Sequence, residues 1–207
     1  MSLITPESVG ELQAALPAKA KREPACRFHS LYDKIYRKDV LLHARQCCRA
    51  NGGAPGVDGV TFAQIESQGV DGWLEELSKE LREKTYRPQA VRRVWIPKPG
   101  TDKQRPLGVP RIKDRVAQMA AVLILEPIFE ADLPDEQYGY QPGRSAHDAI
   151  RAIHGLLNRG HREVVDGDLS GYFDSIPHAQ NASHHECLEA DGQRAEDAHL
   201  PGARGEF

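Results

Sequence analysis

Apolar residues three or four positions apart recur along much of this 207-residue chain, and this spacing is typical of the buried face of an α-helix. One such stretch lies at 28–36. A second follows it, with Asp39 placed to cap its amino end and Gly52 placed to end it. The pattern therefore predicts two consecutive helices, which a turn-rich loop at 51–59 follows.

Three later stretches show the same helical spacing. Asp71 is placed to cap a strongly amphipathic helix whose charged residues lie on the opposite face from its apolar ones. The apolar residues of that helix are Trp73, Leu74, Leu77 and Leu81. Another helix is predicted over 113–129, and a last one begins at a capping box formed by Ser145 and Asp148 and ends at Gly160.

Short apolar runs bounded by turn-forming residues predict three β-strands. Two of them, at 92–97 and 105–109, are joined by the positively charged, turn-forming segment 98–104, which predicts a hairpin with a basic tip. The third strand runs from Val164 to Leu169. Together with the helices, these strands predict a mixed α+β fold.

The two ends of the chain lack such patterns. Residues 1–27, rich in Ala, Pro and Lys, show no sustained periodicity and are expected to form a flexible arm. Residues 179–207 contain no Val, Ile, Met, Tyr or Trp, so they offer too little apolar surface for a core and are expected to be an unrelated, disordered tail. A single domain is therefore expected over 28–178.

The composition of the chain bears on its cellular location and on whether it holds disulfides or zinc. No apolar run approaches the roughly 18 residues needed to cross a bilayer, and the first residues lack the pattern of a secretory signal. The four cysteines form no Cys-x-x-Cys pair, which favours reduced thiols over disulfides or a zinc site. We expect a cytoplasmic protein with no membrane partner.

Charge is strongly segregated along the chain, although the net charge is only −3. Between Glu80 and Arg115, eleven Lys or Arg stand against four Asp or Glu, whereas 179–207 has two against six. A locally basic stripe can bind a phosphate backbone whatever the total charge of the protein. The stripe therefore indicates nucleic acid as a partner, and a solvated charged face is the alternative interpretation.

Asp168 is the first candidate for chemistry. It lies at the end of the third predicted strand, just before a Gly-containing turn, where its carboxylate could hold a hard cation such as Mg²⁺. An Asp in this position is often only a turn former. The surrounding run, Gly167-Asp-Leu-Ser-Gly-Tyr-Phe-Asp-Ser-Ile-Pro-His178, changes that interpretation, because it resembles the first carboxylate motif of group II intron-encoded reverse transcriptases.

Earlier blocks of the chain resemble the same family, in the family's order. They are Gly53–Gly59, the two hairpin segments Arg92–Gly100 and Arg105–Arg111, and Tyr138–Ile150. The resemblance covers about 28–178. It implies a helical N-terminal extension, the fingers of a reverse transcriptase and the start of its palm.

The resemblance also implies an activity, RNA-directed DNA polymerisation in intron mobility, with two Mg²⁺ ions and with Asp168 as the catalytic metal ligand. Lys98 and Arg105 would hold the triphosphate of an incoming deoxynucleotide, and Phe173 would pack under its sugar. Four cations near loops and helix starts would guide RNA, either a group II intron or a template with its primer. They are Arg111, Lys113, Arg115 and Arg144. A DNA target is a further partner of such proteins.

The second carboxylate motif of the family, a Tyr-x-Asp-Asp box, is not found after His178. A frameshift near His178 could have replaced the rest of the enzyme, or a separate chain could supply the rest of the palm. In both cases we expect the 207-residue chain alone not to polymerise. A non-catalytic, maturase-like RNA-binding module and a non-functional relic are the alternative functions.

Overall fold

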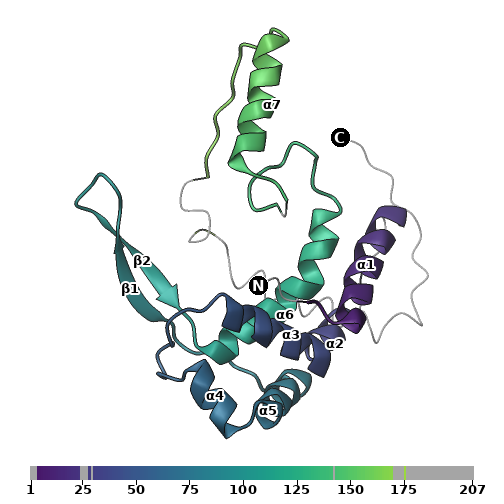
Figure 1. Ribbon diagram of the computed structural model, residues 1–207, viewed down its shortest axis with the longest axis vertical. Helices are drawn as coiled ribbons and strands as arrows, with labels where there is room; N and C mark the ends of the chain where they lie inside the picture. The colour runs from purple at the N-terminus through teal and green to yellow at the C-terminus, as the bar shows by residue number, and fades with distance from the viewer. Residues whose placement is uncertain (1–3, 24–27, 29, 142, 170–174, 176–207) are drawn as a thin grey trace, which may run out of the picture. The chain divides into compact units, whose positions relative to one another are not determined.

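The computed structural model of the protein describes residues 4–23, 28, 30–141, 143–169 and 175 (Figure 1). The chain divides into two compact units, Met1–Ala149 and Ile150–Phe207. Seven helices and two strands lie along the described residues. In chain order they are α1 Glu7–Arg22, α2 Tyr32–Ile35, α3 Lys38–Ala50, α4 Phe62–Gln68, α5 Val70–Arg82, β1 Arg92–Pro97, β2 Gln104–Val109, α6 Ile112–Glu130 and α7 Ala146–Asn158. The mixed α+β fold is confirmed.

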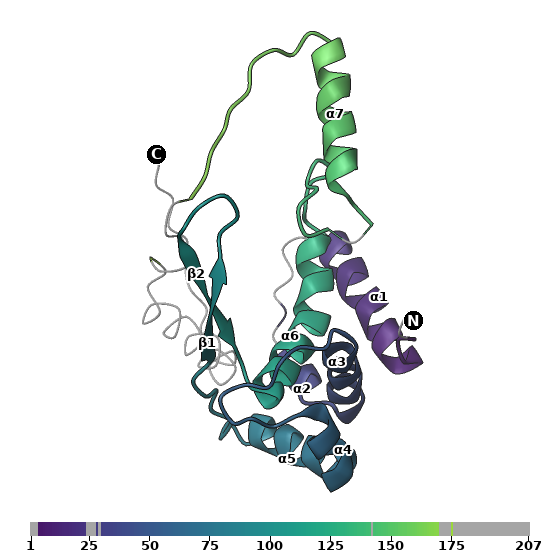
Figure 2. The same ribbon diagram turned by 60° about the vertical axis from the view of Figure 1, so that its left-hand side comes forward.

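Helix α6 is the centre of the first unit, with α1 and α3 lying along it (Figures 1 and 2). Four of its buried residues recur every four positions and therefore lie on one face: Ile112, Val116, Ala120 and Ile124. The side of α3 that packs there buries Val40, Leu41, Ala44 and Cys48. Burying each large aliphatic side chain stabilises the unit by about 1.5–3 kcal/mol, so this helix pair forms most of the core.

Helix α5 closes the core on another side, as its amphipathic pattern predicts. Its buried residues are Leu74, Leu77 and Leu81. Two side-chain hydrogen bonds tie α5 to the chain around α2: Tyr32 Oη donates to the carbonyl of Leu81 at 2.7 Å, and Ser78 Oγ donates to the carbonyl of Tyr36 at 2.7 Å. The apolar face thus sets the packing, and the hydrogen bonds fix the register.

The prediction of a flexible arm over 1–27 is wrong for residues 7–22, which form α1. Val9 is fully buried and Leu16 is 7% exposed, and Gln13 Nε2 donates to the carbonyl of Leu123 in α6 at 3.2 Å. The helix has three large apolar residues, Val9, Leu12 and Leu16, and a proline, Pro17, inside it, so its apolar pattern is short although its alanines favour a helix. Packing on α6 adds the stability that an isolated helix of this length lacks in water.

Helix starts also differ from the prediction. Asp39 lies in the first turn of α3, one residue inside it, and Arg37 is the N-cap. Asp71 likewise lies in the first turn of α5, after Gly69. Acidic residues are stabilising throughout a first turn, because exposed N–H groups give that end a partial positive charge, so sequence alone does not separate the cap from the next residues.

Helix α4 was not predicted, although it carries a clear signal. Thr61 Oγ1 accepts a hydrogen bond from the N–H of Gln64, and Gln64 Oε1 accepts one from the N–H of Thr61, which makes a capping box. The helix is only seven residues long and buries a single side chain, Ile65. The hairpin, α6 and α7 agree with their predictions, including the capping box of Ser145 and Asp148.

The predicted strand from Val164 to Leu169 is not formed, because residues 161–169 have no regular secondary structure. Val165 is 98% exposed, and within the described residues β1 and β2 make the only sheet. A strand needs a neighbour to pair its backbone N–H and C=O groups, and apolar composition alone does not supply one. The tail expected over 179–207 lies outside the described residues.

Within the part of the chain that the structure describes, none of the helices has the length and apolar character required to cross a membrane.

Candidate functional site

The candidate site is the β1–β2 hairpin, which extends away from the helices of its unit (Figures 1 and 2). Its strands are antiparallel, and the register places Pro97 opposite Gln104. The pairing continues one step further, because the N–H of Lys98 donates to the carbonyl of Lys103 at 2.9 Å. Gly100, with φ of 75°, makes the turn between them. The tip is therefore a closed turn with a lysine on each side.

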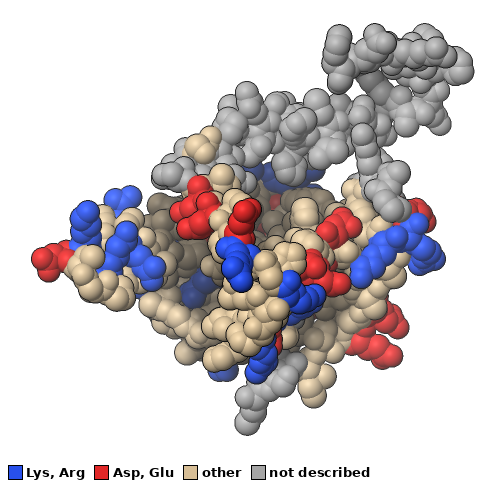
Figure 3. Space-filling model, turned by 90° about the horizontal axis from the view of Figure 1, so that it is seen from above, with Lys and Arg blue, Asp and Glu red and all other residues tan. Residues whose placement is uncertain are grey.

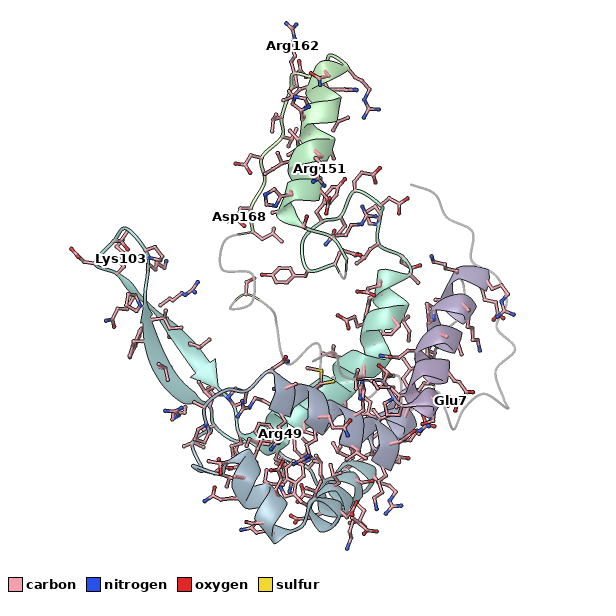
Figure 4. All side chains as sticks on the ribbon, viewed as in Figure 1. Glu7, Arg49, Lys103, Arg151, Arg162 and Asp168 are labelled. Carbon is pink, nitrogen blue, oxygen red and sulfur yellow. The ribbon has the colours of Figure 1, made fainter. Side chains whose placement is uncertain are left out.

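Three cations share one face of the hairpin near this tip. Residues opposite each other in antiparallel strands point to the same face, as do residues two apart in one strand. Lys98 is opposite Lys103, and Arg105 is two residues beyond Lys103, so all three side chains belong to that face. Figure 4 labels Lys103 at the tip, and Figure 3 shows Lys and Arg gathered on this projecting part of the molecule.

These three cations are exposed, and no described residue pairs with any of their side chains. We call Lys98, Lys103 and Arg105 the cationic face. The hairpin contains one carboxylate, Asp102, beside Lys103 in the sequence. Three like charges on one face of a strand pair repel each other and attract a multivalent anion. A triphosphate or a nucleic-acid backbone fits this pattern, because it offers several phosphate oxygens to both lysine and arginine.

The opposite face of the hairpin carries an exposed aromatic side chain with one arginine beside it. Trp95 pairs with Pro106 across the strands and is 53% exposed. The guanidinium of Arg93 lies 5.9 Å from the centre of the Trp95 ring, a distance at which cation and ring attract each other. The two faces of the hairpin therefore differ in chemistry, and the cationic face is the one suited to phosphate.

Two of the four cations that the sequence assigns to RNA, Arg111 and Lys113, lie at the start of α6 and are paired with carboxylates of their own unit. Arg111 Nε is 3.2 Å from Asp114 Oδ2 and 4.0 Å from Asp58 Oδ2. Lys113 Nζ is 2.7 Å from Glu80 Oε1, and the lysine side chain is only 18% exposed. Internal partners neutralise much of both charges, so these side chains are less available to RNA than the cationic face.

The other two RNA-assigned cations also have internal partners. Arg115 Nη2 donates to the carbonyl of Ala54 at 2.9 Å and thereby holds the loop 51–59. Arg144 Nη2 lies 3.8 Å from Asp135 Oδ1, and the Arg144 guanidinium is 5.4 Å from the centre of the Tyr138 ring. Whether any of the four residues contacts RNA stays a prediction.

Asp168 lies in the second unit, on the irregular segment that follows α7 (Figure 4). Its side chain is exposed and has no hydrogen-bond or ion-pair partner among the described residues. Across those residues, no three His, Cys, Asp or Glu side chains are grouped so that they could hold a metal ion. The described part of the chain thus does not form the converging set of carboxylates that a two-metal site needs. Phe173, assigned to the nucleotide sugar, lies outside the described residues.

Sequence reasoning missed two features of this site. Lys103 belongs to the cationic face, and strand alternation could have revealed it, because it is two residues before Arg105 in a predicted hairpin. The loop 51–59 supports the base of the hairpin, since Arg92 Nε donates to the carbonyl of Pro55 at 3.1 Å. No sequence signal indicates that contact, which joins residues far apart in the chain.

Comparison with known families gives one match, to the family described as reverse transcriptase (RNA-dependent DNA polymerase). The match covers residues 96–199 and so includes β2, α6, α7 and Asp168. It extends past His178, and the domain boundary expected at that residue stays a prediction.

Two of the curated relatives match a longer part of the chain than the family model does. Protein YkfC of Escherichia coli (strain K12) is 38% identical over 177 residues, which are 82% of this chain and 46% of the relative. Group II intron-encoded protein LtrA of Lactococcus lactis subsp. cremoris is 37% identical over 155 residues, 73% of this chain and 25% of the relative. Nuclear intron maturase 1, mitochondrial, of Arabidopsis thaliana is 36% identical over 67 residues, 32% of this chain and 9% of the relative. The chain spans less than half the length of each.

Proposed function

Because the chain belongs to the reverse transcriptase (RNA-dependent DNA polymerase) family, we propose that it serves RNA-directed DNA polymerisation of the group II intron type, in intron mobility. It contributes the fingers hairpin and the start of the palm. RNA is the template, and deoxynucleoside triphosphates are the substrates. A DNA target is a further partner in this proposal, and a separate chain that supplies more of the palm is another.

The cationic face is the observation that carries this proposal. Lys98, Lys103 and Arg105 are exposed, lie on one face and have no partner among the described residues. Held over a triphosphate, the lysines act as point charges, and Arg105 makes a two-pronged contact with phosphate oxygens. Such contacts orient the leaving diphosphate and stabilise the negative charge that develops on it during nucleotidyl transfer.

Asp168 is the proposed metal ligand of this chain. Reverse transcriptases use Mg²⁺, which binds carboxylate oxygens, and the exposed Asp168 offers one such ligand. The described residues do not complete the site, so the two-ion arrangement that the sequence implies needs ligands beyond them. The second candidate, a non-catalytic RNA-binding module, needs the cationic face but not Asp168.

Binding measurements on the full chain test the proposal. The double variant Lys98→Gln/Arg105→Gln is compared with Lys79→Gln/Arg82→Gln, which removes the same two charge types from exposed positions of α5. Loss of two charge-assisted contacts should weaken binding of a labelled deoxynucleoside triphosphate about tenfold or more in the hairpin variant. The α5 variant should bind like the parent. Equal affinities for the two variants would refute the assignment.

Primer extension on an RNA template separates the two candidates. If the chain, alone or with a chain that completes the palm, incorporates deoxynucleotides, Asp168→Asn should abolish incorporation and leave RNA binding intact. RNA binding without any incorporation supports the binding module. In that case the affinity should still fall steeply with salt, since phosphate contacts release counterions.

A further inference from the structure

Both ends of the β1–β2 hairpin converge on one carboxylate, that of Asp114 in the first turn of α6. On the side that leads into β1, Tyr86 Oη donates to Asp114 Oδ1 at 2.6 Å, and the N–H of Gln89 lies 3.4 Å from Oδ2. On the side that leaves β2, Arg111 Nε donates to Oδ2 at 3.2 Å. One side chain therefore connects the segments that enter and leave the hairpin.

Asp114 is also deeply buried. It is 2% exposed and is the one buried carboxylate among the described residues. Burial raises the pKa of its carboxyl, but the hydrogen bonds from Tyr86 and Arg111 outweigh this effect and leave the pKa below its ordinary value. Burying an ionised carboxylate costs free energy unless its partners are well placed, and an apolar residue would fill the space without that requirement. What the carboxylate adds is directional contact with particular partners.

The loop 51–59 supports the same region from a second direction. Gly56 is buried against Arg111 so closely that a Cβ atom there would lie 2.6 Å from the Arg111 Cα. The neighbouring carbonyl, that of Pro55, accepts the hydrogen bond from Arg92 at the start of β1. The base of the hairpin is thus held at both strands, through Asp114 and through this loop.

We propose that Asp114, through Tyr86 and Arg111, is a positioning residue that fixes the direction in which the hairpin presents its cationic face. The proposal rests on the function proposed above for Lys98 and Arg105. It assigns Arg111 to the support of the hairpin, where the sequence had predicted contact with RNA. Asp114 itself does not contact the nucleotide.

The length of the hairpin makes a firm base necessary. Strands of six residues at about 3.3 Å per residue put the tip about 20 Å from the base. A tilt of about 10° at the base would then move the tip by about 3.5 Å, which is longer than a hydrogen bond. Because phosphate contacts require the donors to be in place when the substrate binds, mobility at the base lowers affinity through the cost of ordering the hairpin.

Trp95 reports this motion directly. The chain has two tryptophans, so Trp73→Phe leaves Trp95 on the hairpin as the single reporter. In that background, time-resolved fluorescence anisotropy compares Tyr86→Phe with Tyr32→Phe, which removes a hydroxyl hydrogen bond of similar length, 2.7 Å, from a different place in the unit. We expect Tyr86→Phe to increase the amplitude of nanosecond motion of Trp95 and Tyr32→Phe not to do so. Asp114→Asn, which keeps the shape of the side chain, should act like Tyr86→Phe.

Nucleotide binding is the second measurement. Tyr86→Phe should weaken binding of a deoxynucleoside triphosphate by about two- to tenfold, the cost of ordering a loosened segment. Lys98→Gln should weaken binding without changing Trp95 motion. Unchanged Trp95 motion in both Tyr86→Phe and Asp114→Asn overturns the positioning role, whatever the binding result. If the parent chain binds no nucleotide, the proposed function fails, and the anisotropy comparison still decides whether Asp114 holds the hairpin.

Discussion

Gly56→Ala tests the contact between the loop 51–59 and α6 most directly. The added Cβ would lie 2.6 Å from the Cα and 2.7 Å from the backbone nitrogen of Arg111. Arg111 is the N-cap of α6, and its carbonyl accepts the N–H of Arg115 at 3.0 Å, so the helix holds this backbone in place. The loop must move away instead.

The size of the effect follows from the distances. Carbon atoms pack best at about 3.5–4.0 Å, so the loop has to withdraw by about 1 Å. Overpacking of this kind costs about 1–3 kcal/mol. The shift also strains the hydrogen bond from Arg92 to Pro55, worth about 1 kcal/mol. Alanine also lowers the conformational entropy of the unfolded chain, which offsets about 0.4–1 kcal/mol of this loss in the free energy of unfolding. We expect a net loss of about 1–3 kcal/mol in the free energy of unfolding.

Urea unfolding followed by far-UV circular dichroism measures this loss. Gly72→Ala is the matched control, because Gly72 lies in α5 and a Cβ there would meet no atom within 4 Å. Alanine in a helix is favoured over glycine by about 0.5–1 kcal/mol, so the control should be stabilised. A Gly56→Ala protein as stable as the parent, with Gly72→Ala behaving as expected, would refute the close packing of the loop on α6.

Three other predictions concern the core, acid stability and thiol reactivity. Leu16→Ala should lower the free energy of unfolding by about 2–4 kcal/mol, because Leu16 is 7% exposed in the core. Ile4→Ala, at a side chain that is 90% exposed, should have little effect in the same urea titration. The free energy of unfolding should fall below about pH 4, because folding lowers the pKa of Asp114. Such a carboxyl stabilises the folded protein above its unfolded-state pKa, and this contribution is lost as the pH falls through its folded-state pKa. Asp114→Asn should make that fall shallower, and an unchanged slope would contradict the assignment. Burial raises the pKa of the Cys48 thiol to about 11. Alkylation of Cys48 near pH 8, followed by peptide mass spectrometry, should therefore be about a hundredfold slower in the native chain than in urea. Equal rates would show that the thiol is not buried.

Local signals in the sequence predict the hairpin and most of the helices. The capping box of Ser145 and Asp148 acts over three residues, and both of its hydrogen bonds are present. The amphipathic pattern of α5 places Leu74 and Leu77 in the core as predicted. In the hairpin, two short strands and a turn determine the register, which brings Lys98 and Arg105 to one face. These features depend on residues close together in the chain, so their sequence is enough to predict them.

Features that depend on distant segments were not predictable in this way. Residues 7–22 have a short apolar pattern, and α6, about a hundred residues later, packs on α1, in which Val9 and Leu16 are buried. The run from Val164 to Leu169 has the composition of a strand, but no described segment pairs with it. Apolar residues indicate that a segment tends to be buried. Whether it forms a strand depends on whether the fold brings another strand beside it to pair with its backbone.

The basic residues also show which features the sequence determines and which depend on the tertiary structure. By itself the sequence determined that the stretch from Glu80 to Arg115 is basic and that the chain resembles a reverse transcriptase. Only the tertiary structure separated the cations of that stretch, leaving Lys98 and Arg105 without partners in the described chain and pairing Arg111 with the buried Asp114. The physical reason is that sequence records the sign of each charge, whereas its availability depends on the carboxylates and carbonyls that folding brings within reach.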